Sequence, residues 1–425
     1  MHLLAFCLKK NDDSVEKRIT LPEKISKFEV QNHMVRHQSV FKDETKLDIN
    51  YVPRRLPHRE KEHRLLMEFF NFLLQFPERM AQRVIITGEV GTGKTALAQR
   101  FGADITREAN KRSINLRYVH VNCREYRGKL FLIVQHALAI FRPNFPRRGY
   151  SSEELLNTLV QVLDEEDAYV ILTLDEFDAF IDQEGSDAVY KLTRLQEMRV
   201  GKPQRISFMF ILRDLKATGR LDPSARSTLQ RNIISLERYL KDQLLDILSD
   251  RVATAFEPST VPEDVVDLVA GLAVSESGNA RFAIELLWRA GKYADAEDAG
   301  EVEPECVRKA LSSIVPTVRR SELASLGFHQ KLFLLGATRF FKENQKAYAS
   351  LSEIEEAYSV VCEEFGEQPN SHTQLWKYIQ LLSALGILKA EVAAAGVRGR
   401  STRVSLPAVP TYELEKELSA ALENR

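Results

Sequence analysis

The sequence predicts an α/β fold in which a parallel sheet is flanked by helices, followed by a helical region and a small C-terminal unit. Short apolar runs at 84–86, 168–174 and 206–212 have the length and composition of strands buried on both faces. Helical apolar patterns separate these runs, as expected of a parallel sheet. The last hundred residues instead show three helical patterns and then two short strand patterns around a glycine-containing turn.

The composition limits the classes of protein that the chain can represent. Its 425 residues are enough for two or three domains, and the net charge of −1 excludes a general polycation, so any nucleic-acid site must be local. Four isolated cysteines without a C-x-x-C pair argue against a zinc site or disulfide framework and fit a reducing cytoplasm. No apolar run approaches about 18 residues and the N-terminal charges lie in the wrong order for a signal peptide, so no membrane segment is expected.

A glycine-rich segment follows the first predicted strand and precedes a helical pattern. From Gly88 to Thr95 it reads Gly-x-x-x-x-Gly-Lys-Thr. Glycines let the backbone N–H groups approach phosphate oxygens, and the start of the helix presents its positive end to the same anion. The segment predicts a P-loop in which Lys94 reaches the β- and γ-phosphates of ATP or ADP and Thr95 ligates Mg²⁺. The predicted nucleotide contacts are Gly88, Glu89, Val90, Gly91, Thr92, Gly93, Lys94, Thr95 and Ala96.

Polar side chains end the next two core strands. Asp175 and Glu176 follow the strand at 168–174, and Arg213 follows the strand at 206–212. Ligands of open α/β sheets bind at this end of the strands. We therefore expect Asp175 to hold Mg²⁺ together with Thr95, and Glu176 to polarise the water that attacks the γ-phosphate. Arg213 should also face the nucleotide.

Other candidates for the nucleotide site are less specific. Tyr51, His58 and Arg59 precede the first strand, where P-loop proteins often contact the base; a polar leader to a plain helix is the alternative. Arg281 lies in the first turn of a helix, where it opposes the helix dipole and a bound triphosphate would compensate. An arginine between 220 and 231 is a candidate to act on a neighbouring subunit's γ-phosphate, although most surface arginines have no such role.

Two regions carry features of nucleic-acid binding. The loop at 142–150 is basic with interleaved aromatic residues and suits contact with phosphates and insertion into a groove; a solvated loop is the alternative. The C-terminal pattern predicts a winged helix-turn-helix, and residues 371–403 hold five basic residues against one acidic residue. A winged helix that binds protein is the alternative. The candidate DNA contacts are Arg147, Arg148 and Tyr150 in the loop, His372, Thr373, Gln374 and Lys377 on the third helix, and Arg398, Arg400 and Arg403 on the hairpin.

From about residue 45 to 410 the chain resembles an archaeal member of the origin-recognition initiator family, AAA+ ATPases related to eukaryotic origin-recognition and helicase-loading subunits. The P-loop and the acid pair alone indicate only the superfamily. Four further marks narrow the resemblance to this family: 51–53 with 56–60, 121–126, 146–150 and 278–281.

The resemblance implies an AAA+ core at 46–240 after an N-terminal arm at 1–45, a helical lid at 241–316 and a winged-helix domain at 317–425. Arg281 then matches the sensor-2 arginine, and the loop at 142–150 matches an initiator-specific element that touches DNA. Arg213 stands where the family usually has a sensor-1 asparagine. Ser224 stands where an arginine is common, which leaves Arg226 as the nearest candidate for the arginine that acts in trans. Both departures imply a slow ATPase.

The resemblance further implies a replication initiator that binds double-stranded origin DNA under the control of ATP or ADP. It would help to load the replicative helicase, act with related initiator paralogues and be found at the nucleoid in the cytoplasm. One alternative is a nucleotide-clamped, DNA-binding regulator with negligible ATP turnover. Another is a transcription or defence regulator of the nucleotide-switch type.

Overall fold

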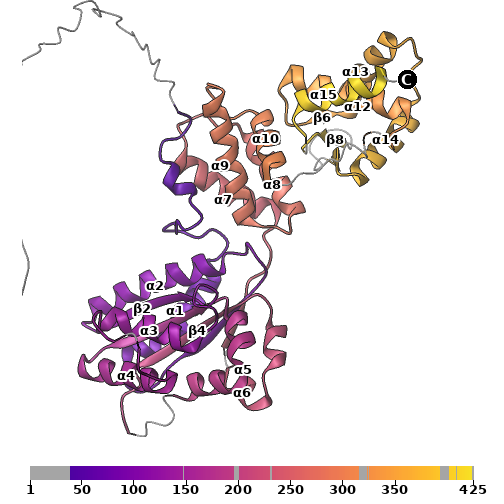
Figure 1. Cartoon of the computed structure of the whole chain (residues 1–425). Helices are drawn as coiled ribbons and strands as arrows, with labels where there is room; N and C mark the ends of the chain where they lie inside the picture. The colour runs from indigo at the N-terminus through magenta and orange to yellow at the C-terminus, as the bar shows by residue number, and fades with distance from the viewer. Residues whose placement is uncertain are drawn as a thin grey trace, which may run out of the picture. The chain divides into compact units, whose positions relative to one another are not determined.

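The computed structural model describes residues 39–146, 148–195, 201–229, 232–314, 323, 325–392, 402–407 and 409–423, which belong to one compact unit (Figure 1). Three of the predicted DNA contacts, Arg147, Arg398 and Arg400, lie outside these residues, as do most of the predicted N-terminal arm and the predicted hairpin turn. Within the described residues, no helix combines the length and the apolar character needed to cross a membrane.

Five parallel strands form a sheet in the order β2-β3-β4-β1-β5. The strands are β1 (Arg83–Thr87), β2 (Leu116–Asn122), β3 (Tyr169–Asp175), β4 (Ile206–Leu212) and β5 (Asn232–Ser235). Every residue of β3 and β4 is buried, because helices cover both faces of the sheet. This double burial explains the continuous apolar runs, and the strands predicted from them are confirmed.

Helices from different parts of the chain cover the two faces of the sheet (Figure 1). One face packs on α1 (Glu60–Gln75) and α2 (Lys94–Lys111). The other packs on α3 (Leu130–Phe141), α4 (Ser152–Glu165), α5 (Phe177–Arg194) and α6 (Pro223–Leu229), with the short 3-10 helix η2 (Leu215–Arg220) before α6. Because side chains alternate along a strand, Val84 and Ile86 pack on the first face and Ile85 on the second.

A second apolar core is built from four helices, α7 (Lys241–Ala255), α8 (Glu263–Ser275), α9 (Ala280–Ala296) and α10 (Pro304–Ile314). Helix α9 continues through Ala296, where Asp295 accepts a hydrogen bond from the backbone N–H of Val40. Residues 40–47, which end in the 3-10 helix η1 (Glu44–Leu47), also belong to this core. Val40 and Leu47 are almost fully buried in it. This part of the predicted arm is therefore ordered, because the lid offers its apolar side chains a partner that the local sequence does not reveal.

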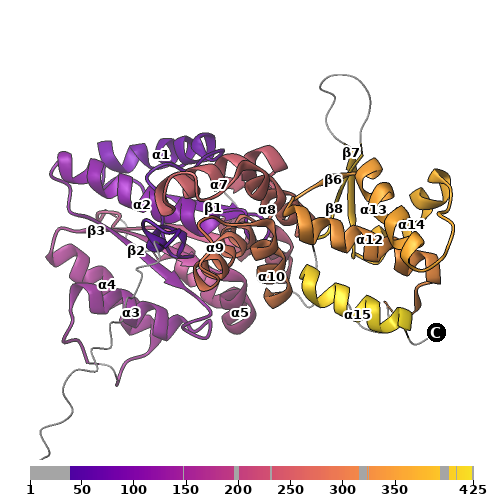
Figure 2. The ribbon, with the colours of Figure 1, turned by 90° about the horizontal axis from the view of Figure 1, so that it is seen from above.

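The C-terminal unit has its own core and contains the predicted three helices and hairpin (Figure 2). Its elements are α12 (Phe328–Asn344), β6 (Ala349–Ser350), α13 (Leu351–Glu364), α14 (His372–Ala384), β7 (Lys389–Val392), β8 (Thr402–Ser405) and α15 (Thr411–Glu423). Strand β6 and helix α15 were not predicted. Ser350 caps α13 through a capping box with Glu353.

A buried arginine joins the lid to the C-terminal unit. Arg308 of α10 has no exposed surface, and its guanidinium donates to the backbone oxygens of Leu406 (2.8 Å) and Lys346 (2.9 Å). It also pairs with Glu305 at 3.0 Å, and Glu305 accepts a hydrogen bond from the backbone N–H of Thr411. Because a buried guanidinium is costly unless its donors are used, this network fixes the C-terminal unit against the lid.

We expect Arg308→Met to destabilise the protein by about 3 kcal/mol, because it leaves Glu305 and two carbonyl oxygens buried without their donor. Thermal unfolding of the full chain, followed by fluorescence, measures the loss. Lys309→Met is the matched control: the same helix carries it, but Lys309 pairs with Glu297 in a partly exposed ion pair and should cost less than about 1 kcal/mol. Equal effects of the two substitutions would contradict the role of Arg308.

Candidate nucleotide site

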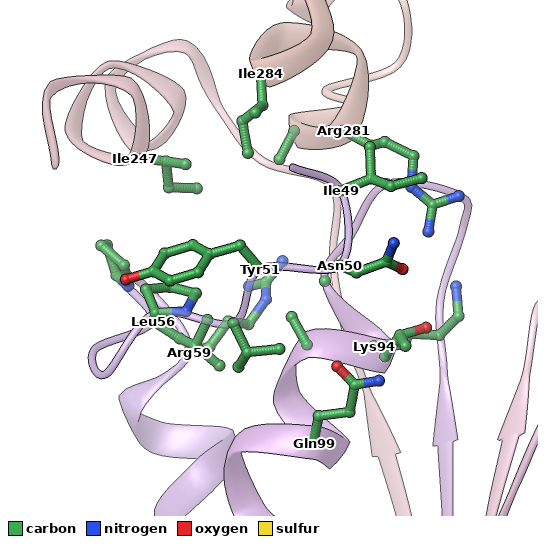
Figure 3. Close-up of a pocket in the computed structure, with 18 of the residues that line it drawn as sticks. Ile49, Asn50, Tyr51, Leu56, Arg59, Lys94, Gln99, Ile247, Arg281 and Ile284 are labelled. Carbon is green, nitrogen blue, oxygen red and sulfur yellow. The ribbon is translucent and has the colours of Figure 1, made fainter. Parts of the chain in front are cut away.

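A cavity of about 640 Å³ lies at the C-terminal ends of β1, β3 and β4. Its walls come from the P-loop, the strand ends, the segment before α1, and helices α7 and α9. Figure 3 shows Lys94 and Arg281 near one end, and Tyr51, Leu56 and Ile247 toward the other. The cavity therefore has a charged end and a mainly apolar end.

The P-loop forms the floor of the charged end. Gly93 caps α2 with φ of 87°, a left-handed conformation that suits glycine. The Nζ of Lys94 donates to the carbonyl oxygens of Gly88 (2.5 Å) and Glu89 (2.6 Å). Burial lowers the pKa of Lys94; Asp175 opposes this shift, and the nearby cations Arg213 and Arg281 add to it. Positive charge is thus concentrated at the start of α2, directly after the P-loop.

An oxygen pair suited to a divalent cation lies beside Lys94. The hydroxyl of Thr95 donates to Oδ2 of Asp175 at 2.7 Å, and the side chain of Asp175 is buried. Burial raises the pKa of Asp175, but hydrogen bonds from His120 and Thr95 outweigh it, so the net pKa is lowered. His120, which the sequence did not single out, lies on β2 with Nε2 at 3.3 Å from Asp175. The carboxylate is therefore held in its charged form.

Glu176 has a constrained backbone and two cationic neighbours. Its φ of 50° is left-handed, which is costly for a residue with a β-carbon. Arg124 Nε lies 2.5 Å from one carboxylate oxygen and Arg213 lies 3.5 Å from the other. Arg213 thus faces the cavity, as predicted from its position at the end of β4. Arg124 was not predicted as a site residue.

A backbone hydrogen bond joins the start of lid helix α9 to the P-loop. The backbone N–H of Ala280 donates to the carbonyl oxygen of Gly91 at 3.2 Å, and Asn279 caps α9 by accepting from the N–H of Phe282. Arg281 follows in the first turn, is exposed and lines the cavity. The positive charge of Arg281 is unfavourable near the positive end of the α9 dipole, and this charge lies at the cavity wall.

Two of the three residues predicted to contact the base, in the segment before α1, lie on the cavity wall. Tyr51 and Arg59 line the cavity, but His58 does not: its Nε2 pairs with Asp246 of α7 at 2.7 Å. Arg59 is buried, donates to the carbonyl oxygens of Thr92 and Glu237, and stacks on Tyr239 with 4.0 Å between guanidinium and ring centroid. Arg59 therefore braces the P-loop as well as lining the cavity.

Most, but not all, predicted P-loop contacts reach the wall. Those that line the cavity are Val90, Gly91, Gly93, Lys94, Thr95 and Ala96, together with Asp175, Glu176, Arg213 and Arg281. Those that do not are Gly88, Glu89 and Thr92, because Glu89 pairs with Arg238 and Thr92 is buried behind the loop.

The lid helices contribute residues to the cavity wall that were not predicted from the sequence. On α7 they are Ile247, Asp250, Arg251, Ala253 and Thr254, and on α9 Ile284 follows Arg281. Ile247, Asp250, Arg251 and Thr254 share one helical face, since each lies three or four residues from two of the others. The sequence contains that face, but only the packing of the lid shows that it meets the cavity.

The predicted DNA contacts that the structure describes do not line the cavity. Arg148 and Tyr150 are exposed, and the ring of Tyr150 packs at a tilt against Phe145 with 5.0 Å between ring centroids. On α14, His372, Thr373 and Lys377 are exposed and Gln374 is partly buried; Arg403 of β8 is exposed. Lys389, counted among the basic residues of this region, instead donates to the carbonyl oxygen of Gly271 on the lid.

Arg226 is not on the wall of this cavity. Its guanidinium donates to the carbonyl oxygens of Thr218, Gly219 and Leu221, which close the turn before α6. Its assignment as the trans-acting arginine stays a prediction.

We expect Gly91→Ala to weaken nucleotide binding at least tenfold. A β-carbon there would lie 2.0 Å from Oδ1 of Asn279, and the φ of 79° disfavours alanine, so the contact between loop and lid must open. Calorimetric titration with ADP measures the effect. Gly219→Ala is the control, because its β-carbon would meet nothing within 4 Å. Unchanged ADP affinity in Gly91→Ala would show that the lid contact does not matter.

Three family models match successive parts of the chain. They are described as an AAA domain at 78–221, a Cdc6 AAA+ ATPase-type lid domain at 245–312 and a CDC6 C-terminal winged helix domain at 321–416. They follow one another in the order of the sheet domain, the lid and the C-terminal unit.

Relatives and solved structures agree with these matches. An ORC1-type DNA replication protein 2 of Sulfolobus acidocaldarius is 33% identical, with 91% of this chain and 95% of the relative covered. The crystal structure of Cdc6p from Pyrobaculum aerophilum matches with a TM-score of 0.80 and 29% identity over 91% of this chain and 99% of that one. The Aeropyrum pernix ORC1 protein in complex with DNA matches with a TM-score of 0.60 and 30% identity, covering 90% and 97%. By this likeness over nearly its whole length, the chain belongs to the ORC1/Cdc6-type family of DNA replication proteins.

Proposed function

We propose that this protein is a replication initiator that binds double-stranded origin DNA, with ATP or ADP and Mg²⁺ held between the sheet domain and the lid. The observation that carries the nucleotide part is the charged end of the cavity, where Lys94, Arg213 and Arg281 converge on the P-loop. Three cations at one end of a cavity favour the binding of a multiply charged anion, and a nucleotide's phosphates supply one. The apolar end of the same cavity leaves room for a base and sugar.

Mg²⁺ fits the oxygen pair of Thr95 and Asp175. Both are hard oxygen ligands, and the low pKa of Asp175 keeps it charged. When bound, the ion would neutralise charge on the phosphate oxygens. Thr95 and Asp175 would hold it, Lys94 would turn from its carbonyl partners toward phosphate, and Glu176 would orient water.

Hydrolysis separates this proposal from a second candidate, a DNA-binding protein clamped by a nucleotide that it does not turn over. The pairing of Glu176 with Arg124 and Arg213 favours slow turnover, because both carboxylate oxygens are paired with guanidinium groups and must be released before they can orient the attacking water.

We expect Glu176→Gln to slow single-turnover ATP hydrolysis at least a hundredfold, because an amide cannot accept the proton of the attacking water. Quenched-flow measurement of ADP formation tests this. Glu153→Gln, which alters a carboxylate paired with Lys191 on the surface, should leave the rate unchanged. Equal rates in wild type and Glu176→Gln would remove the enzymatic role and leave the clamp.

DNA binding is proposed through α14, the hairpin and the loop at 142–150. The exposure of His372, Thr373 and Lys377 on α14, and of Arg403 on β8, supports the contact, and the relative from Aeropyrum pernix is described in complex with DNA. The remaining candidates on the hairpin, Arg398 and Arg400, would add phosphate contacts. Footprinting that protected promoters rather than origin repeats would instead favour a transcription regulator.

We expect Arg400→Ala and Arg403→Ala to weaken DNA binding and to reduce the slope of log K against log salt by about one unit for each lost phosphate contact. Fluorescence anisotropy over a range of salt concentrations measures this. Lys416→Ala, an exposed basic residue on α15, is the control. An unchanged slope in both arginine variants would mean that the hairpin is not on DNA.

The remaining parts of the proposal follow from the family. We infer that the protein works with related initiator paralogues and helps to load the replicative helicase, acting at the nucleoid in the cytoplasm. Reconstitution of helicase loading on origin DNA, with and without this protein, tests the helicase step directly.

A further inference from the structure

One segment before the sheet crosses from the lid to the sheet domain. Val40 and Leu47 are buried in the core of the lid, whereas Leu56 packs on the core between α1, α2 and the sheet. The residues between them, 48–55, all line the cavity, and we call them the strap. The cavity is therefore walled by a segment whose two ends belong to different domains.

The strap is held by a buried arginine of the lid. Arg251 on α7 is 9% exposed, and it donates to the carbonyl oxygens of Lys46 at 2.8 Å and Tyr51 at 3.4 Å. Its guanidinium also lies 4.9 Å from the centroid of the Tyr51 ring. Because a buried guanidinium is costly, these contacts indicate that it is retained to fix the backbone on both sides of residues 48–50.

The arginine holds Tyr51 on the wall of the apolar part of the cavity. Figure 3 shows the Tyr51 ring with Ile247 and Ile284 of the lid on one side and Leu56 on the other. Lys46 also lies over the Tyr51 ring, with 4.6 Å from Nζ to the centroid, so the ring is contacted by two cations. A flat, uncharged ring such as a nucleobase matches this lining of aromatic and branched aliphatic side chains.

We propose that Arg251 is a positioning residue which orders the strap so that the apolar end of the cavity binds the base of the nucleotide. The inference rests on the proposed nucleotide function and deepens it. Arg251 acts through Tyr51 and the strap backbone, not on the phosphates, which lie at the end with Lys94. Its loss should therefore reduce affinity for the nucleoside part of the ligand and spare affinity for the phosphate chain.

The test compares ADP with inorganic tripolyphosphate, each titrated calorimetrically into the full chain with Mg²⁺. We expect Arg251→Met to weaken ADP binding about tenfold or more, while tripolyphosphate binding stays within about twofold of wild type. Lys94→Ala should weaken both ligands. Arg289→Met, which removes a lid arginine paired with Glu285 on α9, should weaken neither.

A double substitution tests whether Arg251 acts through the strap. Tyr51→Ala should show the same selective loss of ADP affinity, and adding Arg251→Met to it should cause little further loss. Independent, additive losses would overturn the proposal. Because removing a buried arginine can unfold the lid, Tyr51→Ala alone carries the comparison of ADP and tripolyphosphate if Arg251→Met does not fold.

The possible results distinguish a failure of the nucleotide site from a failure of the positioning role of Arg251. If wild type binds neither ligand, the proposed nucleotide site itself is wrong. If wild type binds ADP and Arg251→Met binds it equally well, the positioning role is overturned and the nucleotide site stands. Equal losses for ADP and tripolyphosphate would also overturn it, since they would mean that Arg251 only holds the lid in place.

Discussion

Positive charge brought together at the end of a parallel sheet is the constraint on which the rest of this structure depends. Lys94, Arg213 and Arg281 come from a loop, a strand end and a lid helix, and each contributes to the wall of one cavity. Like charges held this close repel one another, and the carboxylates of Asp175, Glu176 and Asp178 oppose this repulsion. A multiply charged anion bound at this end, as we propose, would stabilise the arrangement further.

The cavity depends on contacts between segments that are distant in the sequence. Gly91 of the P-loop meets Ala280 at the start of α9, and Arg59 joins the P-loop backbone to the carbonyl oxygen of Glu237 before α7. The strap adds a second covalent connection between the two domains. A change in the angle of the lid must therefore alter both the loop and the strap, since both are bonded to it.

The lid is connected in turn to the C-terminal unit. Arg308 fixes α10 to the backbone of Leu406 and Lys346, and Lys389 at the base of the hairpin bonds to Gly271 of α8. Breaking a buried cation's contacts costs several kcal/mol, so the hairpin base should follow the lid when the lid moves. These contacts form a continuous physical connection from the nucleotide cavity to the elements proposed to bind DNA.

The sequence alone determined the core strands β1, β3 and β4, the two hairpin strands, most of the helices, the P-loop and the acid pair, because each depends on local periodicity or on residues adjacent in the chain. The four-residue strand β5 was not predicted. The sequence also contained the signal for α15, whose leucines recur at every fourth position, although that helix was not predicted. It did not reveal β6, the packing of residues 40–47 on the lid, or the partner of His58. Tertiary structure decided these, and it brought His120, Arg124 and Arg251 to the site, because contacts across strands and between domains join residues whose spacing in the chain carries no signal.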